Sequence, residues 1–245
     1  MAIGVVSDIH GNLFALRAVV DDMVRRGVSR VINLGDNLSG PLLPRETGEY
    51  LRAQAWLHLA GNHERQILES RPTAVYNSDA YAHERLTPEL LSWLRELRPV
   101  VELDADLLCC HGTPRSDSEY LLETVTPEGI RLATTDEIEE RLEGNRHALV
   151  LCGHSHVPRA VRHGGSLLVN PGSVGLQAYF AKGPPSYIVE TGSTDARYAI
   201  VERLETGWRA ELISVPYDYS AAVALAAHVS REWAHALGTG RAFTG

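Results

Sequence analysis

Five short apolar runs, each ending in a polar residue that can bind a metal ion, constrain the fold of this chain more than any other feature. The first run, residues 3–6, is rich in β-branched side chains, which favour a strand. Apolar residues at helical spacing follow between Asn12, which can cap a helix, and Gly27, which can end one. The next run is residues 31–34. Strand, helix and strand in this order predict a parallel pair of strands joined by a crossover helix.

The same alternation continues to about residue 152 and then changes. Further helices are predicted near residues 45–53 and 88–97 and from Pro127 and Thr135, and further strands at residues 56–60, 100–103, 107–110 and 148–152. Short strands separated by Gly and Pro turns then predict antiparallel or mixed pairing, near residues 160–162, 167–169, 187–190, 199–204 and 210–214. A last helix is predicted over residues 220–237. No linker or repeat marks a boundary, so residues 1–245 are expected to form one α/β domain.

The charge of the chain excludes two classes of protein. Its 23 Lys and Arg against 31 Asp and Glu give a formal net charge of −8, whereas nucleic-acid coats and binders of anionic membranes need a positive field. A small phosphorylated substrate held by metal ions remains compatible with this charge. With 44% hydrophobic and 22% charged residues, the composition is that of a globular protein.

The cysteines and the N-terminus predict the compartment. The chain has 3 cysteines, Cys109, Cys110 and Cys152, too few for a disulfide framework, which indicates a reducing environment. The N-terminus lacks a basic segment followed by a long apolar run, and no stretch approaches about 18 uninterrupted apolar residues. We therefore expect a cytoplasmic protein without a membrane anchor. An oligomer is left open, because the apolar face of the last helix can pack on the sheet or on another subunit.

The polar residues that end the apolar runs form one set of candidates for a metal site. They are Asp8, His10, Asp36, Asn62, His63, His111, His154 and His156. The C-terminal ends of parallel strands meet at one crevice of an α/β sheet, and residues two apart in extended chain point the same way. Taken singly, several have another explanation: Asp8 or Asp36 can cap a helix, Asn62 can serve a turn, His63 a surface and His111 a loop. The pair His154 and His156 has little structural purpose of its own. Their order and shared position favour a single site.

These motifs resemble a known superfamily. The segments Asp8-Ile9-His10-Gly11, Gly35-Asp36, Gly61-Asn62-His63-Glu64, His111 and Gly153-His154-Ser155-His156 are similar to the five ordered motifs of the calcineurin-like metallophosphoesterases. The compact layout is similar to their small bacterial and archaeal phosphodiesterase branch. The resemblance implies an α/β fold with four α/β/β/α layers, in which helices flank two mixed sheets and a dinuclear metal site lies at the strand ends.

The resemblance also implies roles for the individual residues. One metal would take Asp8, His10 and His156, the other Asn62, His111 and His154, with Asp36 bridging the two. His63 would be the general acid, or would stabilise charge, beside the leaving group, and Asn62, His63 and Arg65 would contact substrate. Independently of the resemblance, a mixture of carboxylate and imidazole donors favours Mn²⁺, with Fe, Zn, Ni and Co as alternatives.

Hydrolysis of a phosphodiester is the reaction that we expect. Two cations can share a hydroxide because metal binding lowers the pKa of water, and this bridging hydroxide would attack phosphorus. The substrate would be a small phosphorylated molecule, with a nucleotide as one option. A phosphomonoesterase, an asymmetric dinucleoside polyphosphate hydrolase and a non-catalytic interaction scaffold are the alternatives. Related protein phosphatases and symmetrical dinucleoside polyphosphatases carry an Arg after the second motif, which residues 35–41 lack.

Several nearby residues keep two interpretations. Arg45, Arg65 and Arg115 can each bind phosphate or lie on an ordinary surface. Glu64 can orient His63 or open the following helix. Tyr76 and Tyr81 can form a cap that stacks a base, or serve the core or surface. Substrate specificity is expected in the loops around residues 37–46, 70–87 and 112–126.

Overall fold

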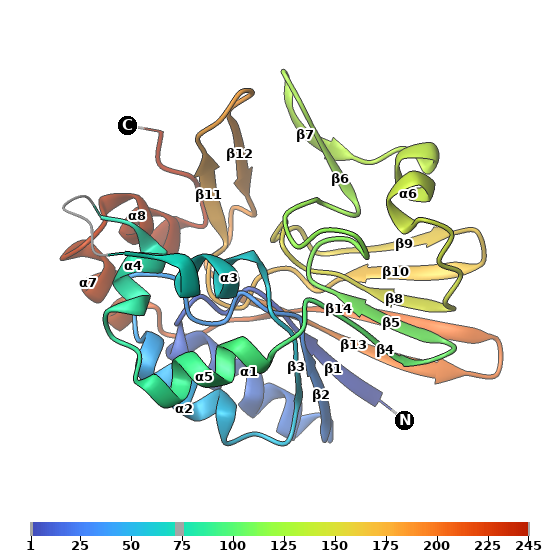
Figure 1. The fold of residues 1–245 in the computed structure, drawn as a ribbon, viewed down its shortest axis with the longest axis horizontal. Helices are drawn as coiled ribbons and strands as arrows, with labels where there is room; N and C mark the ends of the chain where they lie inside the picture. Colours follow the sequence, from blue (N-terminus) through green and yellow to red (C-terminus); the bar gives the residue numbers. More distant parts are fainter. Residues whose placement is uncertain (1, 72–75, 245) are drawn as a thin grey trace.

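Two five-stranded sheets of mixed strand direction form the centre of the molecule (Figure 1), in a computed structural model that describes residues 2–71 and 76–244. The first sheet has the order β14 (Gly207–Val215), β13 (Ala196–Leu204), β1 (Ala2–Val6), β2 (Arg30–Asn33) and β3 (Leu57–His58). Strands β1, β2 and β3 are parallel, whereas β13 runs antiparallel to β1. The parallel pair predicted from the first two apolar runs is therefore confirmed.

The second sheet combines a parallel centre with antiparallel edges. Its order is β4 (Val100–Asp104), β5 (Leu107–Cys110), β8 (Leu149–Leu151), β10 (Ser166–Asn170) and β9 (Arg159–His163). Strands β5, β8 and β10 are parallel, and the edge strands β4 and β9 pair antiparallel with β5 and β10. The C-terminal ends of the parallel strands in this sheet therefore share one edge, as they do in the first sheet.

The two sheets pack face to face around one apolar layer. Val5 and Ile32 of the first sheet share a buried cluster with Cys109, Leu151 and Val169 of the second. Because successive residues of a strand face opposite sides, the neighbouring residues of each strand belong to outer layers.

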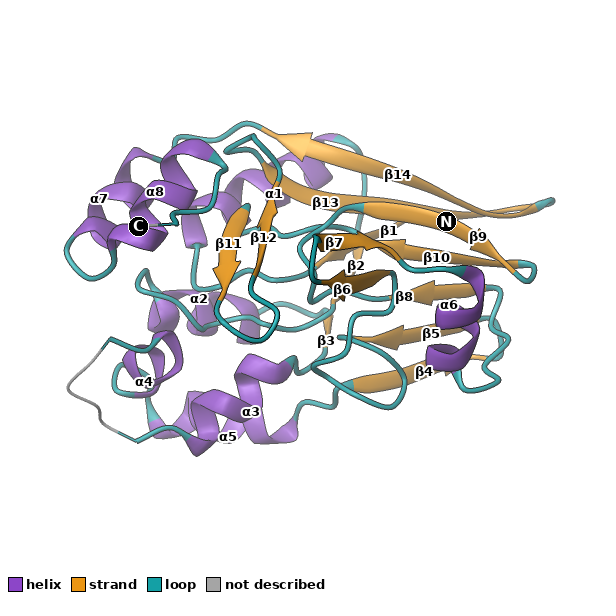
Figure 2. Cartoon of the chain, turned by 90° about the horizontal axis from the view of Figure 1, so that it is seen from above, coloured by secondary structure: helices purple, strands orange, loops and turns teal. Residues whose placement is uncertain are grey.

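Helices cover the outer face of each sheet. On the first sheet these are α1 (Leu13–Arg25), α2 (Pro44–Arg52) and α5 (Pro88–Glu96), and on the second α6 (Thr135–Leu142). Asn12 starts α1 by accepting a hydrogen bond from the Ala15 N–H at 3.1 Å, as predicted. The view from above places α6 at the opposite end of the molecule from α7 and α8 (Figure 2). The expected four-layer arrangement of helices, sheet, sheet and helix is confirmed.

One predicted helix is replaced by a hairpin. The sequence predicts a helix from Pro127, but the chain forms the antiparallel strands β6 (Glu123–Thr126) and β7 (Gly129–Leu132), with Pro127 in the turn between them. Pro favours the second position of a turn as well as the first position of a helix. The Thr126 hydroxyl accepts from the Glu128 N–H at 3.3 Å, and Gly129 takes a φ of 128° that suits only glycine. The helix prediction was therefore wrong.

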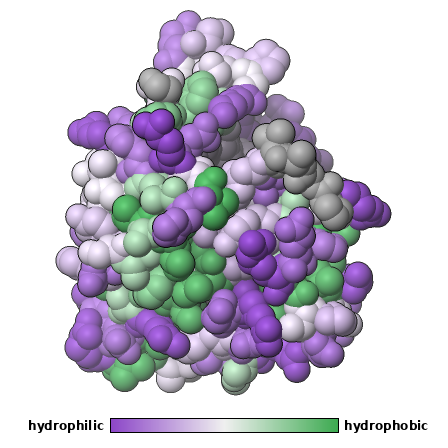
Figure 3. Space-filling view, turned by 90° about the vertical axis from the view of Figure 1, so that its left-hand side faces the viewer, coloured by the Kyte–Doolittle hydropathy of each residue, from purple (hydrophilic) through white to green (hydrophobic). Residues whose placement is uncertain are grey.

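The predicted C-terminal helix is two helices. Helix α7 (Ser220–Ala227) ends before a short break, and Ser230 then caps α8 (Arg231–Thr239) by accepting from the Trp233 N–H at 3.4 Å. Serine is a preferred N-cap, so it starts the second helix. Seen face on, this end of the molecule carries an apolar patch over α7 and α8 that hydrophilic side chains surround (Figure 3). None of the described helices is long and apolar enough to cross a membrane.

Three further elements lie around the strand ends. They are the hairpin of β11 (Ala178–Ala181) and β12 (Tyr187–Glu190), and the helices α3 (Asn62–Glu69) and α4 (Ser78–His83). Strand β12 agrees with the predicted strand at residues 187–190, whereas the sequence does not predict β11. The hairpin therefore adds an unpredicted wall beside the strand ends.

Candidate metal centre

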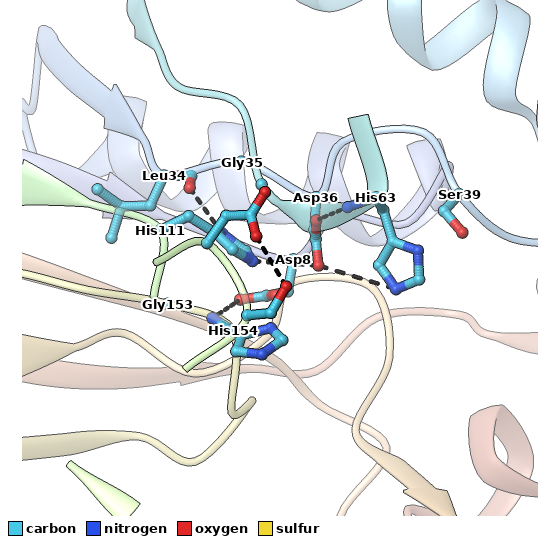
Figure 4. A network of polar contacts seen from close by, with 12 residues as sticks. Asp8, Leu34, Gly35, Asp36, Ser39, His63, His111, Gly153 and His154 are labelled. Atoms are coloured by element: carbon cyan, nitrogen blue, oxygen red, sulfur yellow. Dashed lines mark hydrogen bonds and ion pairs between the residues drawn. The ribbon is translucent and has the colours of Figure 1, made fainter. Parts of the chain in front are cut away.

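The polar residues that follow the strands lie together at one edge of the sheets. Asp8 and His10 follow β1, Asp36 follows β2, His111 follows β5, His154 and His156 follow β8, and Asn62 and His63 begin α3. The potential ligand atoms of Asp8, His10 and His156 all lie within 4.8 Å of one another, as do those of Asp36, His111 and His154. Figure 4 shows Asp8, Asp36, His111 and His154 converging from different elements. The structure thus brings most of the predicted ligands into two adjacent groups.

The first group has its histidines fixed by backbone carbonyls. His10 Nδ1 donates to the Ser39 carbonyl at 3.0 Å, and His156 Nδ1 donates to the Leu176 carbonyl at 2.8 Å. A carbonyl only accepts, so Nδ1 carries the proton and each Nε2 is free to bind a cation. These two Nε2 atoms lie 3.1 Å apart, and His156 Nε2 is 3.3 Å from Asp8 Oδ1. Two lone pairs this close face a common point, which suits a shared cation.

The second group repeats this construction. His111 Nδ1 donates to the Leu34 carbonyl at 2.9 Å, and its Nε2 lies 3.2 Å from Asp36 Oδ2. His111 is fully buried, and Asp36 is 1% exposed. The other oxygen of Asp36, Oδ1, accepts a hydrogen bond from the backbone N–H of His63 at 2.9 Å. Its carboxylate therefore keeps Oδ2 toward the histidines while Oδ1 is tied to helix α3.

The pKa values of the candidate ligands reflect their burial and the charged side chains next to them. Burial alone would raise the pKa of Asp36, but His111 and His63 beside it hold that pKa well below its usual value. Burial opposes the charge on His111, yet Asp36 raises its pKa to about 10. Burial and His156 lower the pKa of His10 to about 3, and burial and His111 lower that of His154 to about 4. His10 and His154 are therefore neutral imidazoles next to ionised carboxylates, and the negative charge of Asp36 that favours a proton on His111 also favours a bound cation.

Backbone strain is concentrated in these same residues. Asp8, His10, Asp36, His154 and His156 all have positive φ, between 52° and 69°. Among the described residues other than glycine, Glu143 alone joins them. Such conformations cost of order 1–3 kcal/mol each and persist only where the surroundings enforce them. The turns after the strands are therefore shaped to aim side chains rather than to minimise backbone energy.

Glu64 holds the loops of two strands against each other. Its carboxylate accepts from the backbone N–H groups of Asp36 (2.8 Å), Asn37 (2.8 Å) and Gly61 (2.6 Å). Burial and the nearby Asp36 raise its pKa to about 7. The sequence allows Glu64 either to orient His63 or to open the following helix. The structure shows the second role, because Glu64 caps the start of α3. A Cβ on Gly61 would collide with the Asp36 carboxylate, so only glycine fits there.

His63 stands at the edge of the centre with a partner that the sequence did not reveal. Its Nδ1 donates to Asp79 Oδ1 at 2.7 Å, and its Nε2 lies 4.0 Å from Asp36 Oδ2. Burial opposes its charge, but Asp36 and then Asp79 raise its pKa to about 9. Asp79 lies in α4, 16 residues further along the chain, and no motif marks it. The side chain of His63 is 26% exposed, so it is open to the cavity.

Unpartnered polar atoms test whether the site suits metal ions. Asp8 Oδ1, Asn62 Oδ1 and His111 Nε2 are buried and have no hydrogen-bond partner. Buried polar atoms of folded proteins are normally hydrogen bonded. One of these three atoms belongs to each ligand group, and the third belongs to Asn62, the remaining predicted ligand. Carboxylate, amide and imidazole donors in one pocket suit divalent transition metals. The residues present therefore fit two cations.

The three arginines that the sequence suggests as phosphate-binding residues all form ion pairs with carboxylates outside the cavity. Arg65 donates to both Asp117 oxygens at 2.9 Å, Arg45 to Glu49 at 2.9 Å, and Arg115 to Glu119 at 2.6 Å. None of the three lines the cavity beside the histidines, which His10, Asp36, His63, His154 and His156 share. The substrate role of Arg65 stays a prediction, and the structure places this side chain in an ion pair.

Comparison with known proteins agrees with the geometry. Residues 1–195 match a family model described as the calcineurin-like phosphoesterase superfamily domain. An uncharacterised protein of Methanocaldococcus jannaschii is 26% identical over 88% of each chain. The crystal structure of a metallophosphoesterase from Sphaerobacter thermophilus has a TM-score of 0.78 at 25% identity, covering 98% of this chain and 99% of that one. A hypothetical protein from Pyrococcus horikoshii shares the fold, with a TM-score of 0.73 at 18% identity and 98% of each chain covered.

Proposed function

The chain belongs to the calcineurin-like phosphoesterase superfamily, and we propose that it is a two-metal phosphodiesterase. The observation that carries this proposal is the pair of adjacent ligand groups, Asp8, His10 and His156 beside Asp36, His111 and His154. Both groups open into one cavity. A single group would serve one cation, whereas two groups side by side suit the paired centres that hydrolyse phosphate esters.

The proposed ligand roles are those that the family resemblance implies. Asp8, His10 and His156 would hold one cation and Asn62, His111 and His154 the other, with Asp36 between them. When bound, the cations would supply an activated water and positive charge against the phosphate. The mixture of oxygen and nitrogen donors favours Mn²⁺. The chain itself contributes fixed donor directions, because backbone carbonyls set which nitrogen of His10, His111 and His156 faces the site.

His63 supplies a proton in the proposed reaction. Asp79 fixes its Nδ1 and, with Asp36, favours its charged form, so Nε2 carries a proton toward the cavity. A leaving alkoxide needs such a donor within hydrogen-bond reach. Asp79 is a positioning residue, because it acts through His63.

The charge of the cavity favours a diester over a monoester. In residues 2–71 and 76–244, no arginine or lysine lines the cavity, and its acidic side chains are Asp36 and Glu232. A diester carries one negative charge, whereas a monoester carries about two at neutral pH. With countercharge from the cations alone, the singly charged ester is the better match. A polyphosphate would place further charge near Glu232.

Hydrolysis of an aryl phosphodiester beside the matching monoester tests the proposal. Protein loaded with Mn²⁺ should release phenolate from the diester faster, and a chelator should stop the release. Faster turnover of the monoester would make the protein a phosphatase instead. No turnover of either ester by protein shown to contain two metal ions would contradict the proposal and favour the scaffold alternative.

A further inference from the structure

An aromatic wall lines the cavity of about 300 Å³ beside the candidate centre. The wall comes from β11, α8 and the C-terminal tail, and its aromatic members are Tyr179, Phe180, Trp233 and Phe243. Leu176, Ala178 and Ala236 also line the cavity. The volume is at the lower end of the range for small-molecule sites. The cavity is therefore lined both by members of the ligand groups and by apolar and aromatic side chains.

Trp233 is held as a rigid member of this wall. Its ring lies edge-on to His10, with ring centroids 5.8 Å apart at an interplanar angle of 74°. A Cβ on Gly40 would approach the Trp233 ring to 2.9 Å, so glycine makes room for the indole. Trp233 also packs with Ala222 and Leu237 in the cluster that joins α7 and α8. The indole is thus placed beside a candidate metal ligand by residues from both ends of the chain.

Phe243 is fixed from several sides, although it belongs to the tail. Its ring lies 5.5 Å from that of His235, and the Arg231 guanidinium lies 5.9 Å from its centroid. The preceding residues tie the tail to β12, because Arg241 and the Ala242 N–H both bond to Glu190. A second aromatic ring is therefore held at the cavity.

Few charges interrupt the aromatic side. Glu232 is its charged member, and it accepts from Lys182, the only lysine of the chain, at 2.9 Å. Lys182 itself does not line the cavity, and none of the described residues that do is a lysine or an arginine. A second phosphate on the substrate would meet no partner there, whereas a neutral flat ring would meet several aromatic faces.

We propose that this wall binds a flat aromatic ring carried by the leaving group of the phosphodiester, as the base of a nucleoside is carried. The proposal rests on the phosphodiesterase function proposed above. His63 lines the same cavity, and the ring of His10 lies 5.3 Å from that of His63 and 5.8 Å from that of Trp233, so an ester arm that departs beside His63 is the arm beside the wall. Hydrolysis breaks the P–O bond to this arm and joins the water oxygen to phosphorus, and the leaving oxygen takes a proton from His63. Base stacking on aromatic side chains is sequence-tolerant, so the wall suits nucleosides as a class.

The methyl ester of adenosine 5′-monophosphate tests the proposal through its products. If the adenosine arm lies against the wall, the products are adenosine and methyl phosphate; if the methyl arm lies there, they are AMP and methanol. We expect adenosine in roughly 10-fold excess, the size of a typical stacking contribution. The methyl ester of ribose 5-phosphate, which lacks the base, should show no such preference. The product ratio does not depend on how much of the protein is folded or metal-loaded.

Substitutions in the wall separate stacking from simple packing. Trp233→Leu and Phe243→Ala should bring the ratio of adenosine to AMP toward one, whereas Trp233→Phe should keep most of the excess. Equal products, or AMP in excess, from the wild-type protein would overturn the proposal while leaving the phosphodiesterase intact. An unchanged ratio in both disruptive variants would overturn it as well.

Direct binding keeps the proposal testable if no ester is hydrolysed. Isothermal titration of the metal-free protein with adenosine should show saturable binding that Phe243→Ala weakens roughly 10-fold, and ribose should not bind. Absence of turnover with adenosine still bound would contradict the proposed function alone. Absence of adenosine binding would contradict the aromatic wall.

Discussion

His10 and Trp233 lie side by side, with ring centroids 5.8 Å apart, but the two regions they represent are held in different ways. At the centre, His10 donates to a buried carbonyl and sits among fully buried carboxylates. In the aromatic wall, Glu232 is held by Lys182 through an ion pair in which both side chains are more than half exposed, at 53% and 68%. The centre is assembled from residues 8–156, and the wall from residues 176–243.

This difference separates the positions that fix the chemistry from those that select the substrate. When a buried ligand residue is removed, its polar and charged partners remain buried without a hydrogen bond or a countercharge, which is costly. An exposed ion pair contributes little, since solvent can replace either partner. We therefore expect substitutions at the centre to cost much more than substitutions of charged residues in the wall, and the following predictions test that order from the largest effect to the smallest.

Asp36→Asn should have the largest effect. The neutral amide removes the charge of the residue proposed to bridge the two cations, so metal binding and turnover should fall together, with turnover reduced about 10³-fold, as for loss of a central charge-stabilising group. Metal content by mass spectrometry and hydrolysis of an aryl diester measure the two effects. Asp106→Asn, in the exposed turn between β4 and β5, is the matched control. Full metal content in Asp36→Asn would contradict the proposed bridging role.

Glu64→Ala should destabilise the fold around the centre. Three buried N–H groups, of Asp36, Asn37 and Gly61, lose their acceptor. The free energy of unfolding should fall by about 4 kcal/mol, because unsatisfied donors cost about 1–3 kcal/mol each and water can reach part of the space. Guanidinium unfolding measures the change. Glu69→Ala, at the exposed end of the same helix, should change the free energy by less than about 0.5 kcal/mol; equal losses would remove the distinction.

His63→Ala tests the boundary between the two regions. The variant should keep its metal ions, because His63 belongs to neither ligand group, while turnover falls about 10²-fold through loss of the proton donor. Asp79→Asn should lower the rate less and shift the pH profile, since it acts on the charge of His63. Loss of metal from His63→Ala would show that the assigned role is wrong.

The pH dependence of stability tests the framework behind the centre. Burial lowers the pKa of His58 to about 4, and its ring lies against Trp56 and Trp93. Its folded pKa is below the ordinary value of 6.5, so the unfolded chain takes up the proton first. The stability from the neutral ring is complete above pH 6.5 and is lost as the pH falls toward 4, by about 2 kcal/mol for a partly exposed ring.

Comparison with His58→Gln isolates that contribution. The free energy of unfolding of the wild type should fall more steeply between pH 6.5 and 4 than that of the variant, as measured by urea unfolding at each pH. The exposed His228→Gln is the control and should follow the wild type. Parallel curves for wild type and His58→Gln would show that the ring does not resist protonation.

Lys182→Ala should have the smallest effect. Its ion pair with Glu232 is exposed, so the free energy of unfolding should change by less than about 1 kcal/mol. Turnover of a singly charged aryl diester should stay within about twofold. A larger loss of turnover would show that Lys182, which does not line the cavity, takes part in substrate binding, and would weaken the contrast between the two regions.

The sequence predicts that the candidate ligands lie together because most of them are local to a strand end. Asp8, Asp36, His111 and the pair His154 and His156 all follow apolar runs that are easy to recognise. Asp79 and Trp233 carry no comparable signal. Each depends on a helix reaching the site from a distant part of the chain, and the sequence does not record that approach. Tyr76 and Tyr81, the alternative base-stacking residues, instead pack on each other, with centroids 6.2 Å apart.

The fold shows the same limit. Buried strands and the helices packed on them are predicted because their apolar spacing is regular. The hairpin of β6 and β7 and the break between α7 and α8 depend on turn chemistry at Pro127 and Ser230, where one residue type serves two structures. The short strand β11 is found only through its pairing with β12. Residues 72–75 of the predicted specificity loop at 70–87 lie outside the described part of the chain.

The left-handed backbone at five candidate ligands limits how this protein can be engineered. The usual way to stabilise a residue with positive φ is to replace it by glycine. At Asp8, His10, Asp36, His154 and His156 that replacement removes the side chain on which the proposed chemistry depends. Glu143, which ends α6 in the same conformation, is not a candidate ligand, so glycine there would relieve the backbone without removing a side chain of the centre. A thermostable variant should therefore be sought at Glu143 and at similar positions outside the centre, and the strained turns should be left unchanged.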